Sequence, residues 1–222
     1  MNELFIVLLI GHLLSDYTLQ TEQLAKNKIK NVSGLSVHIF IVFIVYLLLW
    51  LFFRFNWIIL IGVVIGHGLI DLMKYWVSDY LEERISYGID QILHLLLLCV
   101  LSWNSDFISN TFEINRWIAL LLLMSKPANV TFKVYFKKYA KMEESESIEG
   151  AGALIGTIER IIMLIFVILQ QYASMGLILT AKSIARFDKI SKDQMFAEYY
   201  LLGSLFSVLW VLVSCLLLGY FA

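Results

Sequence analysis

Residues 35–53 read LSVHIFIVFIVYLLLWLFF, an apolar run of helical length that ends at Arg54. A bilayer core of about 30 Å needs about 20 such residues in a helix. Similar runs recur along the chain, and they lack the period-two alternation of a β-barrel strand. The sequence therefore predicts an all-α, polytopic transmembrane helical bundle with seven or eight membrane helices, because residues 171–187 could instead form a re-entrant or surface helix. The expected spans are 3–20, 35–53, 56–77, 88–103, 115–135, 151–170, 171–187 and 197–221.

The composition also indicates a membrane protein. Of the 222 residues, 60% are hydrophobic and only 16% are charged, and the mean hydropathy is +0.79. Soluble domains carry about 25% charged residues, and a chain this short has too little interior to bury such an apolar excess. These values exclude a soluble enzyme, a nucleic-acid binder and a disordered tail. The loops between the expected spans leave no room for a soluble domain.

Basic residues in the loops set the expected orientation. With the N-terminus outside, most of the 17 Lys and Arg residues fall in inner loops, whereas the outer loops keep only Arg54 and Arg116. The chain begins without a basic segment, so we expect its first helix to be retained rather than cleaved as a signal peptide. The sequence thus predicts a multi-pass protein with its N-terminus outside.

All four histidines fall in the first four expected spans, and three of them have an aspartate four residues away. Residues at i and i+4 lie on one face of a helix, so each pair points its imidazole and its carboxylate the same way. The histidines also fall near the cytoplasmic ends of their helices. We therefore expect four helices to bring imidazoles to one level of the bundle. The pairs are His12 with Asp16, His67 with Asp71 and His94 with Asp90, and His38 is the fourth histidine.

Ionisable groups at membrane depth are costly and usually face a cavity or one another. Imidazole and carboxylate together suit zinc, iron or manganese, so a divalent metal, zinc above all, is the expected cofactor. The candidate ligands are more numerous than one tetrahedral ion requires. Either some of these residues only hydrogen-bond to the ligands, or two ions share the site. Two other interpretations stay open, namely hydrogen bonds that only lock the bundle and a pathway for protons or ions. The expected ligands are His12, Asp16, His38, His67, Asp71, Asp90 and His94, with Asp71 and Asp90 as candidate catalytic residues.

Charges also interrupt the apolar sequence of the C-terminal half. Lys182 and Arg186 lie four residues apart, so one helix face carries two cations, which suits a phosphate headgroup. The alternatives are an interhelical ion-pair network and cations that reach the membrane surface on long side chains. The residues expected to support the site or to bind substrate are Gln20, Lys74, Gln91, Glu159, Arg160, Lys182, Arg186 and Glu198.

The order of these motifs, H-x3-D-x2-LQ, then H, then H-x3-D-x2-K, then DQ-x2-H, resembles bacterial membrane proteins grouped as domain-of-unknown-function family 3307. The later stretches GTIERIIM, AKSIARF and AEYYLLGSLFS resemble the second half of the same family, so we expect the resemblance to cover nearly the whole chain. It implies an architecture and a place in the bacterial inner membrane, but no reaction. A helical bundle with a His/Asp site is more distantly similar to membrane-bound metal-dependent hydrolases.

Two regions are expected. Residues 1–103 would form a four-helix His/Asp membrane bundle, and residues 104–222 would carry the remaining membrane helices, packed on the first part as one unit. The most concrete function is metal-assisted hydrolysis of a lipid or lipid-linked phosphoester. The alternatives are a proton- or metal-ion transporter or channel, and a non-catalytic metal-binding membrane subunit. Membrane lipids are the expected partners, nucleic acid is not, and a homo-oligomer or a membrane partner subunit stays open.

Overall fold

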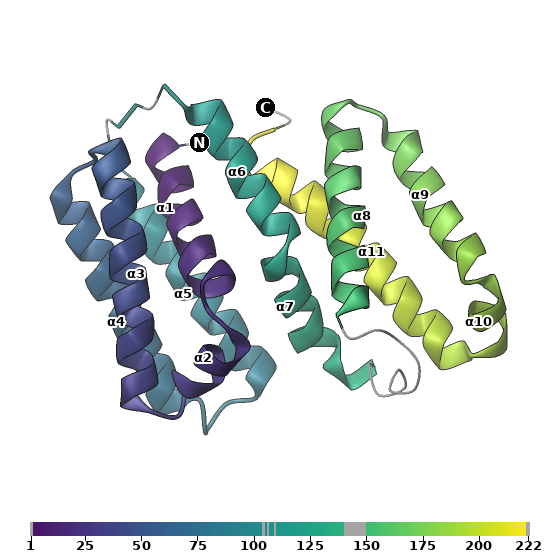
Figure 1. Ribbon diagram of the computed structural model, residues 1–222, viewed down its shortest axis with the longest axis horizontal. Helices are drawn as coiled ribbons and strands as arrows, with labels where there is room; N and C mark the ends of the chain where they lie inside the picture. Colours follow the sequence, from purple (N-terminus) through teal and green to yellow (C-terminus); the bar gives the residue numbers. More distant parts are fainter. Residues whose placement is uncertain (1, 104, 106, 109, 140–149, 221–222) are drawn as a thin grey trace. The chain divides into compact units, whose positions relative to one another are not determined.

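The computed structural model describes residues 2–103, 105, 107–108, 110–139 and 150–220, and every regular element among them is helical. The all-α prediction is therefore confirmed for the described residues. The chain divides into two compact units, Met1–Leu122 and Leu123–Ala222. The boundary lies inside helix α6, Phe112–Met124 (Figure 1).

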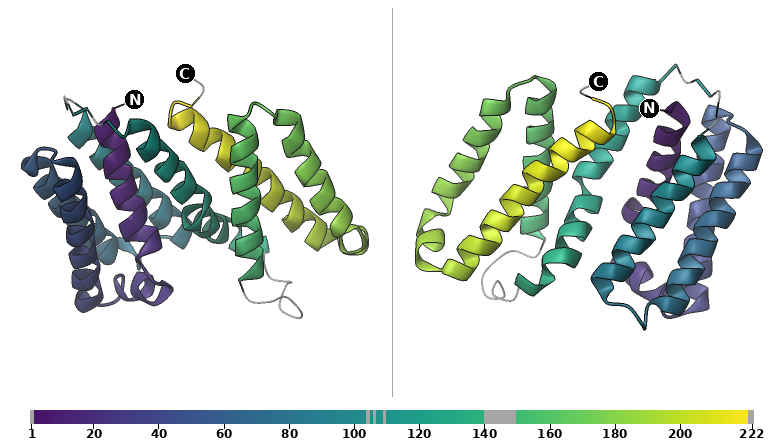
Figure 2. Two further views of the ribbon diagram at one scale, coloured as in Figure 1. Left: turned by 45° about the horizontal axis from the view of Figure 1, so that its top comes forward. Right: turned by 180° about the vertical axis from the view of Figure 1, so that it is seen from behind.

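Unit 1 packs a short buried helix against long ones. Helix α1, Glu3–Leu13, lies against α3 and α5, and α4 packs against the same two helices (Figure 2). The side chains of α1 are apolar and buried along nearly its whole length, so α1 forms the core of the unit. The long helices are α3, Val32–Phe53; α4, Trp57–Val77; and α5, Glu83–Ser102.

A π-helical turn, Leu14–Thr18, follows α1 directly and contains Asp16. The amide of Leu19 donates to the carbonyl of Leu14, five residues back, at 2.8 Å. Such turns add one residue to a helical repeat and are frequent at functional sites. Here the wider turn ends the first helix and carries a buried carboxylate into the interior of the unit.

The short helix α2, Glu22–Asn27, follows the π-helical turn and packs on α3. Its N-terminus is capped by Thr21, whose side-chain oxygen accepts from the amide of Leu24 at 3.2 Å. Gly34 allows the close approach of α2 to α3, because a Cβ at this position would lie 2.7 Å from the carbonyl carbon of Asn27. The end of α2 is thereby held against the start of α3.

Unit 2 is also a helical bundle. Helix α11 packs against α7, α8 and α10, and α8 packs in turn against α7 and α9. A short 3-10 turn, Lys137–Tyr139, follows α7. The helices are α7, Lys126–Phe136; α8, Ala151–Ile168; α9, Tyr172–Ala185; α10, Phe187–Lys192; and α11, Gln194–Leu217.

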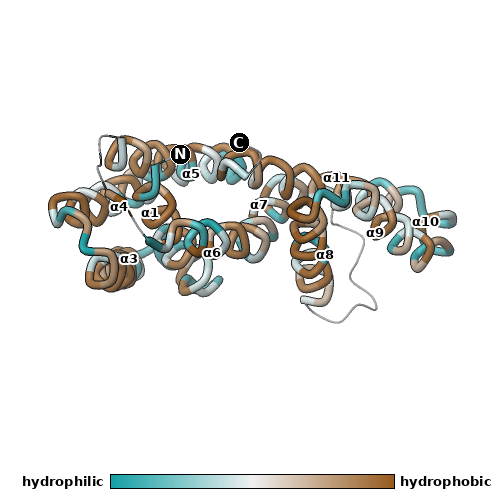
Figure 3. The backbone as a smooth tube through the Cα atoms, turned by 90° about the horizontal axis from the view of Figure 1, so that it is seen from above, coloured by the Kyte–Doolittle hydropathy of each residue, from teal (hydrophilic) through white to brown (hydrophobic). Residues whose placement is uncertain are grey.

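Five helices among the described residues, α3, α4, α5, α8 and α11, are long and apolar enough to cross a membrane. Hydrophobic residues cover most of α3 and α8 in Figure 3. The chain is thus a multi-pass helical membrane protein. The prediction of seven or eight membrane helices is wrong, because three of the eight expected spans do not form helices of sufficient length.

The three failures have separate physical reasons. Helix α1 has 11 residues and is only about 16 Å long at about 1.5 Å per residue, well short of the bilayer core. The expected span 115–135 breaks at Ser125, because Pro127 lies in the first turn of α7 and has no amide to continue the hydrogen bonds of α6. The expected span 171–187 forms α9, whose 14 residues reach about 21 Å.

Candidate metal centre

All four histidines of the chain meet inside unit 1, each from a different helix. His12 lies near the end of α1 and His38 near the start of α3, while His67 and His94 come from α4 and α5. Each is at most 2% exposed. Ring centroids are 4.2 Å apart for His67 and His94, 5.0 Å for His12 and His94, and 5.4 Å for His38 and His67. The predicted convergence of the histidines is confirmed, and metal binding stays a prediction.

Four possible ligand atoms lie close together in this cluster. His38 Nε2 and His67 Nε2 are 3.2 Å apart. Asp16 Oδ1 lies 3.7 Å and 3.2 Å from these two nitrogens, and Asp71 Oδ2 lies 3.1 Å and 3.4 Å from them. An ion held tetrahedrally at about 2.0–2.1 Å spaces its ligand atoms about 3.3–3.4 Å apart. These five distances are therefore close to the ligand spacing around a zinc ion, and Asp16, His38 and His67 form one group of possible ligands.

One atom of this set lacks a hydrogen bond. Asp71 Oδ2 is buried and has no hydrogen-bond partner among the described residues. Leaving a buried acceptor unpaired costs about 1–3 kcal/mol. A cation between the two imidazole nitrogens and the two carboxylate oxygens would remove this cost. The donor set and the unpaired oxygen thus fit a small divalent ion.

Further nitrogen atoms with bare lone pairs lie beside these four atoms. His94 Nδ1 lies 2.8 Å from the backbone carbonyl of Asp90, which can only accept, so Nδ1 carries the proton and Nε2 is bare. His12 Nε2 donates to Gln91 Oε1 at 3.2 Å, which leaves His12 Nδ1 bare as well. Both bare nitrogens are buried without a partner in the described part of the chain. Ligand atoms of His12, His67 and His94 lie within 4.8 Å of one another.

Asp90 is the carboxylate nearest to His94. Its Oδ2 accepts from Lys74 Nζ at 2.8 Å and from Gln91 Nε2 at 3.0 Å, while its Oδ1 lies 3.6 Å from His94 Nδ1. Lys74 and Gln91, expected to support the site, therefore hold its third carboxylate. One ligand atom each from Asp71, Asp90 and His94 also lies within 4.8 Å of the others. The cluster thus offers more ligands than one tetrahedral ion requires.

Lys28, the C-cap residue of α2, is buried in the same cluster. Its Nζ lies 3.0 Å from Asp71 Oδ1, 3.7 Å from Asp16 Oδ2 and 3.3 Å from His38 Nε2. Burial alone would lower the pKa of Lys28, but the carboxylates of Asp16 and Asp71 outweigh it and raise this pKa above its ordinary value. The side chain is therefore a charged ammonium group in contact with the candidate ligands.

Two contributors to this cluster are not predicted by the sequence pattern. Lys28 alternates with Lys26 and Lys30 in an expected inner loop, and nothing in the pattern separates the three. Tyr17 is the second contributor, and its hydroxyl donates to Gln91 Oε1 at 2.7 Å and lies 2.8 Å from the hydroxyl of Tyr87. Only the fold of the π-helical turn and of α2 brings these residues inward.

The remaining residues expected to support the site lie elsewhere. Gln20 follows the π-helical turn, and its Oε1 is buried without a hydrogen-bond partner among the described residues. In unit 2, Lys182 Nζ lies 2.8 Å from Glu159 Oε2, an ion pair between α9 and α8. Arg186 is exposed and its guanidinium lies over the Phe196 ring. A role for these cations in binding a phosphate headgroup stays a prediction.

Two further residues of the C-terminal set make contacts of their own. Arg160 is buried and donates to the carbonyl of Met124 at 2.8 Å and to Asn129 Oδ1 at 2.6 Å. It thereby holds α8 to the end of α6 and to α7. Glu198 is exposed and accepts from Gln194 one turn earlier at 3.2 Å. These contacts stabilise unit 2 and do not identify a ligand.

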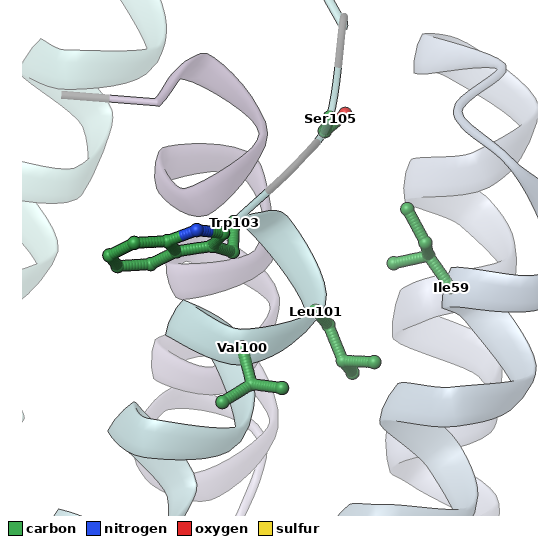
Figure 4. A pocket seen from close by; sticks show the side chains of 5 residues that line it. All are labelled: Ile59, Val100, Leu101, Trp103 and Ser105. Atoms are coloured by element: carbon green, nitrogen blue, oxygen red, sulfur yellow. The ribbon is translucent and has the colours of Figure 1, made fainter.

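A pocket lies where α4 begins and α5 ends (Figure 4). Its lining is mostly apolar and contains none of the candidate ligands. The pocket is therefore separate from the His/Asp cluster. The residues that line it are Ile59, Val100, Leu101, Trp103 and Ser105.

Comparison with protein families gives a match in the first part of the chain. Residues 4–121 match a family described as "Protein of unknown function (DUF3307)". The matched residues cover more than half of the chain and end next to the boundary of unit 1. The expectation of a resemblance over nearly the whole chain was too broad, because residues after 121 lie outside the match. No curated protein and no solved structure matches the chain.

Proposed function

We propose that this chain, which belongs to the DUF3307 family, holds a divalent metal ion inside unit 1 and uses it to hydrolyse a phosphoester. Zinc is the ion that fits best. The observation that carries the proposal is the spacing of 3.1–3.7 Å that separates the two histidine nitrogens from each other and from one oxygen of each of two aspartates. The ligands would be Asp16, His38, His67 and Asp71.

The substrate class follows from the setting of the site. The ligands lie inside a multi-pass membrane bundle, so a lipid or a lipid-linked phosphoester is the substrate class that we infer. A divalent ion supplies Lewis acidity toward a phosphoryl oxygen when it is bound. The residues of unit 1 would then orient the substrate and move the proton.

His94 is the residue that we assign to proton transfer. Its bare Nε2 would accept a proton from the attacking water as the water oxygen bonds to phosphorus. The same proton would pass to the oxygen of the leaving alcohol as the phosphorus–oxygen bond breaks. The carboxylate of Asp90, 3.6 Å from His94 Nδ1, would stabilise the imidazolium formed between these steps.

The apolar interior of α1 favours this enzyme over a transporter. An ion crossing the bundle would need polar groups beyond the histidines. Between its N-terminus and Gly11, the buried part of α1 is made of apolar side chains at 0–5% exposure. They leave no polar route along this helix within the described residues. These side chains are Leu4, Ile6, Val7, Leu8, Leu9 and Ile10.

Metal content tests the site directly. Wild-type protein purified in detergent with added zinc should contain stoichiometric zinc by elemental analysis, and His67→Ala should lose it, because His67 Nε2 contacts both carboxylates. The matched control is Leu69→Ala, which changes a 60% exposed residue on the same helix and should keep its zinc. Zinc retained by His67→Ala, or missing from the wild type, would contradict the proposed site.

We also place the protein in the bacterial inner membrane with its N-terminus outside. Although α1 alone is too short to cross the bilayer, α1 and the π-helical turn carry the chain from one end of unit 1 to the other, because Asn2 donates to the carbonyl of Ser102 at the end of α5 and Asp16 lies beside His38 near the start of α3. Basic residues of unit 1 support this orientation, since Lys26, Lys30, Lys74 and Arg84 lie near its inner end and Arg54 near its outer end. In a variant without Cys99 and Cys215, a cysteine at exposed Lys30 should resist an impermeant maleimide in intact cells, and a cysteine at Glu113 should react. Labelling of position 30 from outside would reverse the orientation.

A further inference from the structure

Lys28 connects a surface helix to the buried cluster. Helix α2 itself has no buried residue, and Lys26 on it is exposed. Lys28, at its C-terminal cap, is only 5% exposed and reaches the ligands Asp16, His38 and Asp71. The exposed segment is thus tied to the site by one charged side chain.

The ammonium of Lys28 uses a lone pair that a metal ion would need. A lysine side chain has only donors, so the 3.3 Å contact with His38 Nε2 requires this nitrogen to accept from Lys28. His38 Nε2 is also one of the four proposed ligand atoms. An ion and the N–H of Lys28 cannot share this single lone pair.

The same competition applies to the carboxylates. Lys28 Nζ faces Asp71 Oδ1 and Asp16 Oδ2, whereas the other oxygen of each carboxylate faces the imidazoles. A divalent ion at the imidazoles would therefore lie close to the ammonium on the same two carboxylates. Two cations repel strongly at such a distance in a buried site.

We propose that Lys28 is a tethered cation that occupies the ligand set until a divalent ion displaces it, and that it thereby sets the affinity of the site for the ion. This inference rests on the proposed metal site. When the ion binds, the ammonium leaves His38 and both aspartates. The segment that ends α2 moves with it, away from the interior.

The first experiment measures zinc affinity by competition with a chromophoric chelator, using full-length protein in detergent. Lys28→Met should bind zinc at least about tenfold more tightly than the wild type, because it removes the competing cation and keeps an apolar stem of similar length. Lys26→Met is the control on the same helix and should match the wild type. Unchanged or weaker zinc affinity in Lys28→Met would overturn the inference.

The second experiment needs no variant and decides the matter if Lys28→Met does not fold. Trypsin should cleave the bond between Lys28 and Ile29 faster in zinc-loaded wild type than in zinc-free protein, relative to cleavage after exposed Lys26. Calorimetry would first show that the protein binds zinc. If the rate of cleavage after Lys28, relative to that after Lys26, were then the same with and without zinc, the role of Lys28 would be overturned and the metal site would stand. A wild type that binds no zinc would overturn the metal site and this inference together.

Discussion

Replacing Asp71 with alanine should lower the free energy of unfolding of the metal-free protein by about 3–5 kcal/mol. The reason is that the substitution leaves the buried positive charge of Lys28 without its partner. Lys28 Nζ lies 3.0 Å from Asp71 Oδ1 and is buried, so its ammonium would lose its nearest carboxylate without gaining water. Reversible denaturation in mixed micelles, after removal of metal by a chelator, measures the loss.

A double-mutant cycle separates the ion pair from the packing of Asp71. The variant carrying both Asp71→Ala and Lys28→Met should be less destabilised than the sum of the two single changes, because no buried charge is left unpaired between them. Asp188→Ala is the surface control, since its partner Lys192 is 3.9 Å away and both side chains are mostly exposed. It should change stability by less than about 0.5 kcal/mol. A similarly small effect of Asp71→Ala would contradict a buried ion pair.

Hydropathy predicted the long helices because a membrane-spanning helix must be apolar over the thickness of the bilayer core, and hydropathy detects such apolar segments. The expected span 35–53 falls within α3, and 56–77 differs from α4 by one residue. The same measure failed for α1, Glu3–Leu13, because a helix buried inside a bundle is as apolar as one that faces lipid. Mean hydropathy cannot distinguish these two environments.

The spacing of His and Asp residues predicted the cluster but not its closest contacts. His67 and Asp71 are four residues apart on α4, and the distance between His67 Nε2 and Asp71 Oδ2 is 3.4 Å, as expected for side chains on one helix face. Asp16 Oδ1, however, is nearer to His67 at 3.2 Å than to His12, its neighbour in sequence, at 3.6 Å. Helical periodicity fixes the face on which a side chain lies, whereas the partner across the interface depends on how helices pack.

Lys28 shows what the sequence could not reveal. A lysine in a polar loop is normally solvated, and Lys26 and Lys30 are indeed exposed. Lys28 is buried because the π-helical turn ends the first helix early and Gly34 allows α2 to lie against α3. Neither feature has a periodic signature, so the sequence pattern does not distinguish Lys28 from Lys26 and Lys30.

The largest kinetic effect is expected at His94. With phosphatidic acid in mixed micelles as the probe, zinc-loaded His94→Ala should release inorganic phosphate about 10²–10⁴-fold more slowly than the wild type, the usual contribution of a general acid or base. Its zinc content should stay at the wild-type level, because His94 is not one of the four proposed ligands. Leu96→Ala, at a 54% exposed position on the same helix, is the control and should leave the rate unchanged.

The two readouts together separate the roles open to this residue. A slow variant that keeps its zinc identifies His94 as the proton carrier, since its bare Nε2 is then available for water. Loss of zinc would instead make His94 a ligand, and the ligand atoms of His12, His67 and His94, within 4.8 Å of one another, would then hold an ion. If zinc-loaded wild type releases no phosphate from this lipid or from a lipid-linked phosphoester, a non-catalytic metal-binding subunit becomes the better interpretation. The His/Asp cluster would then bind its ion for structure or sensing, and Lys28 would still regulate its entry.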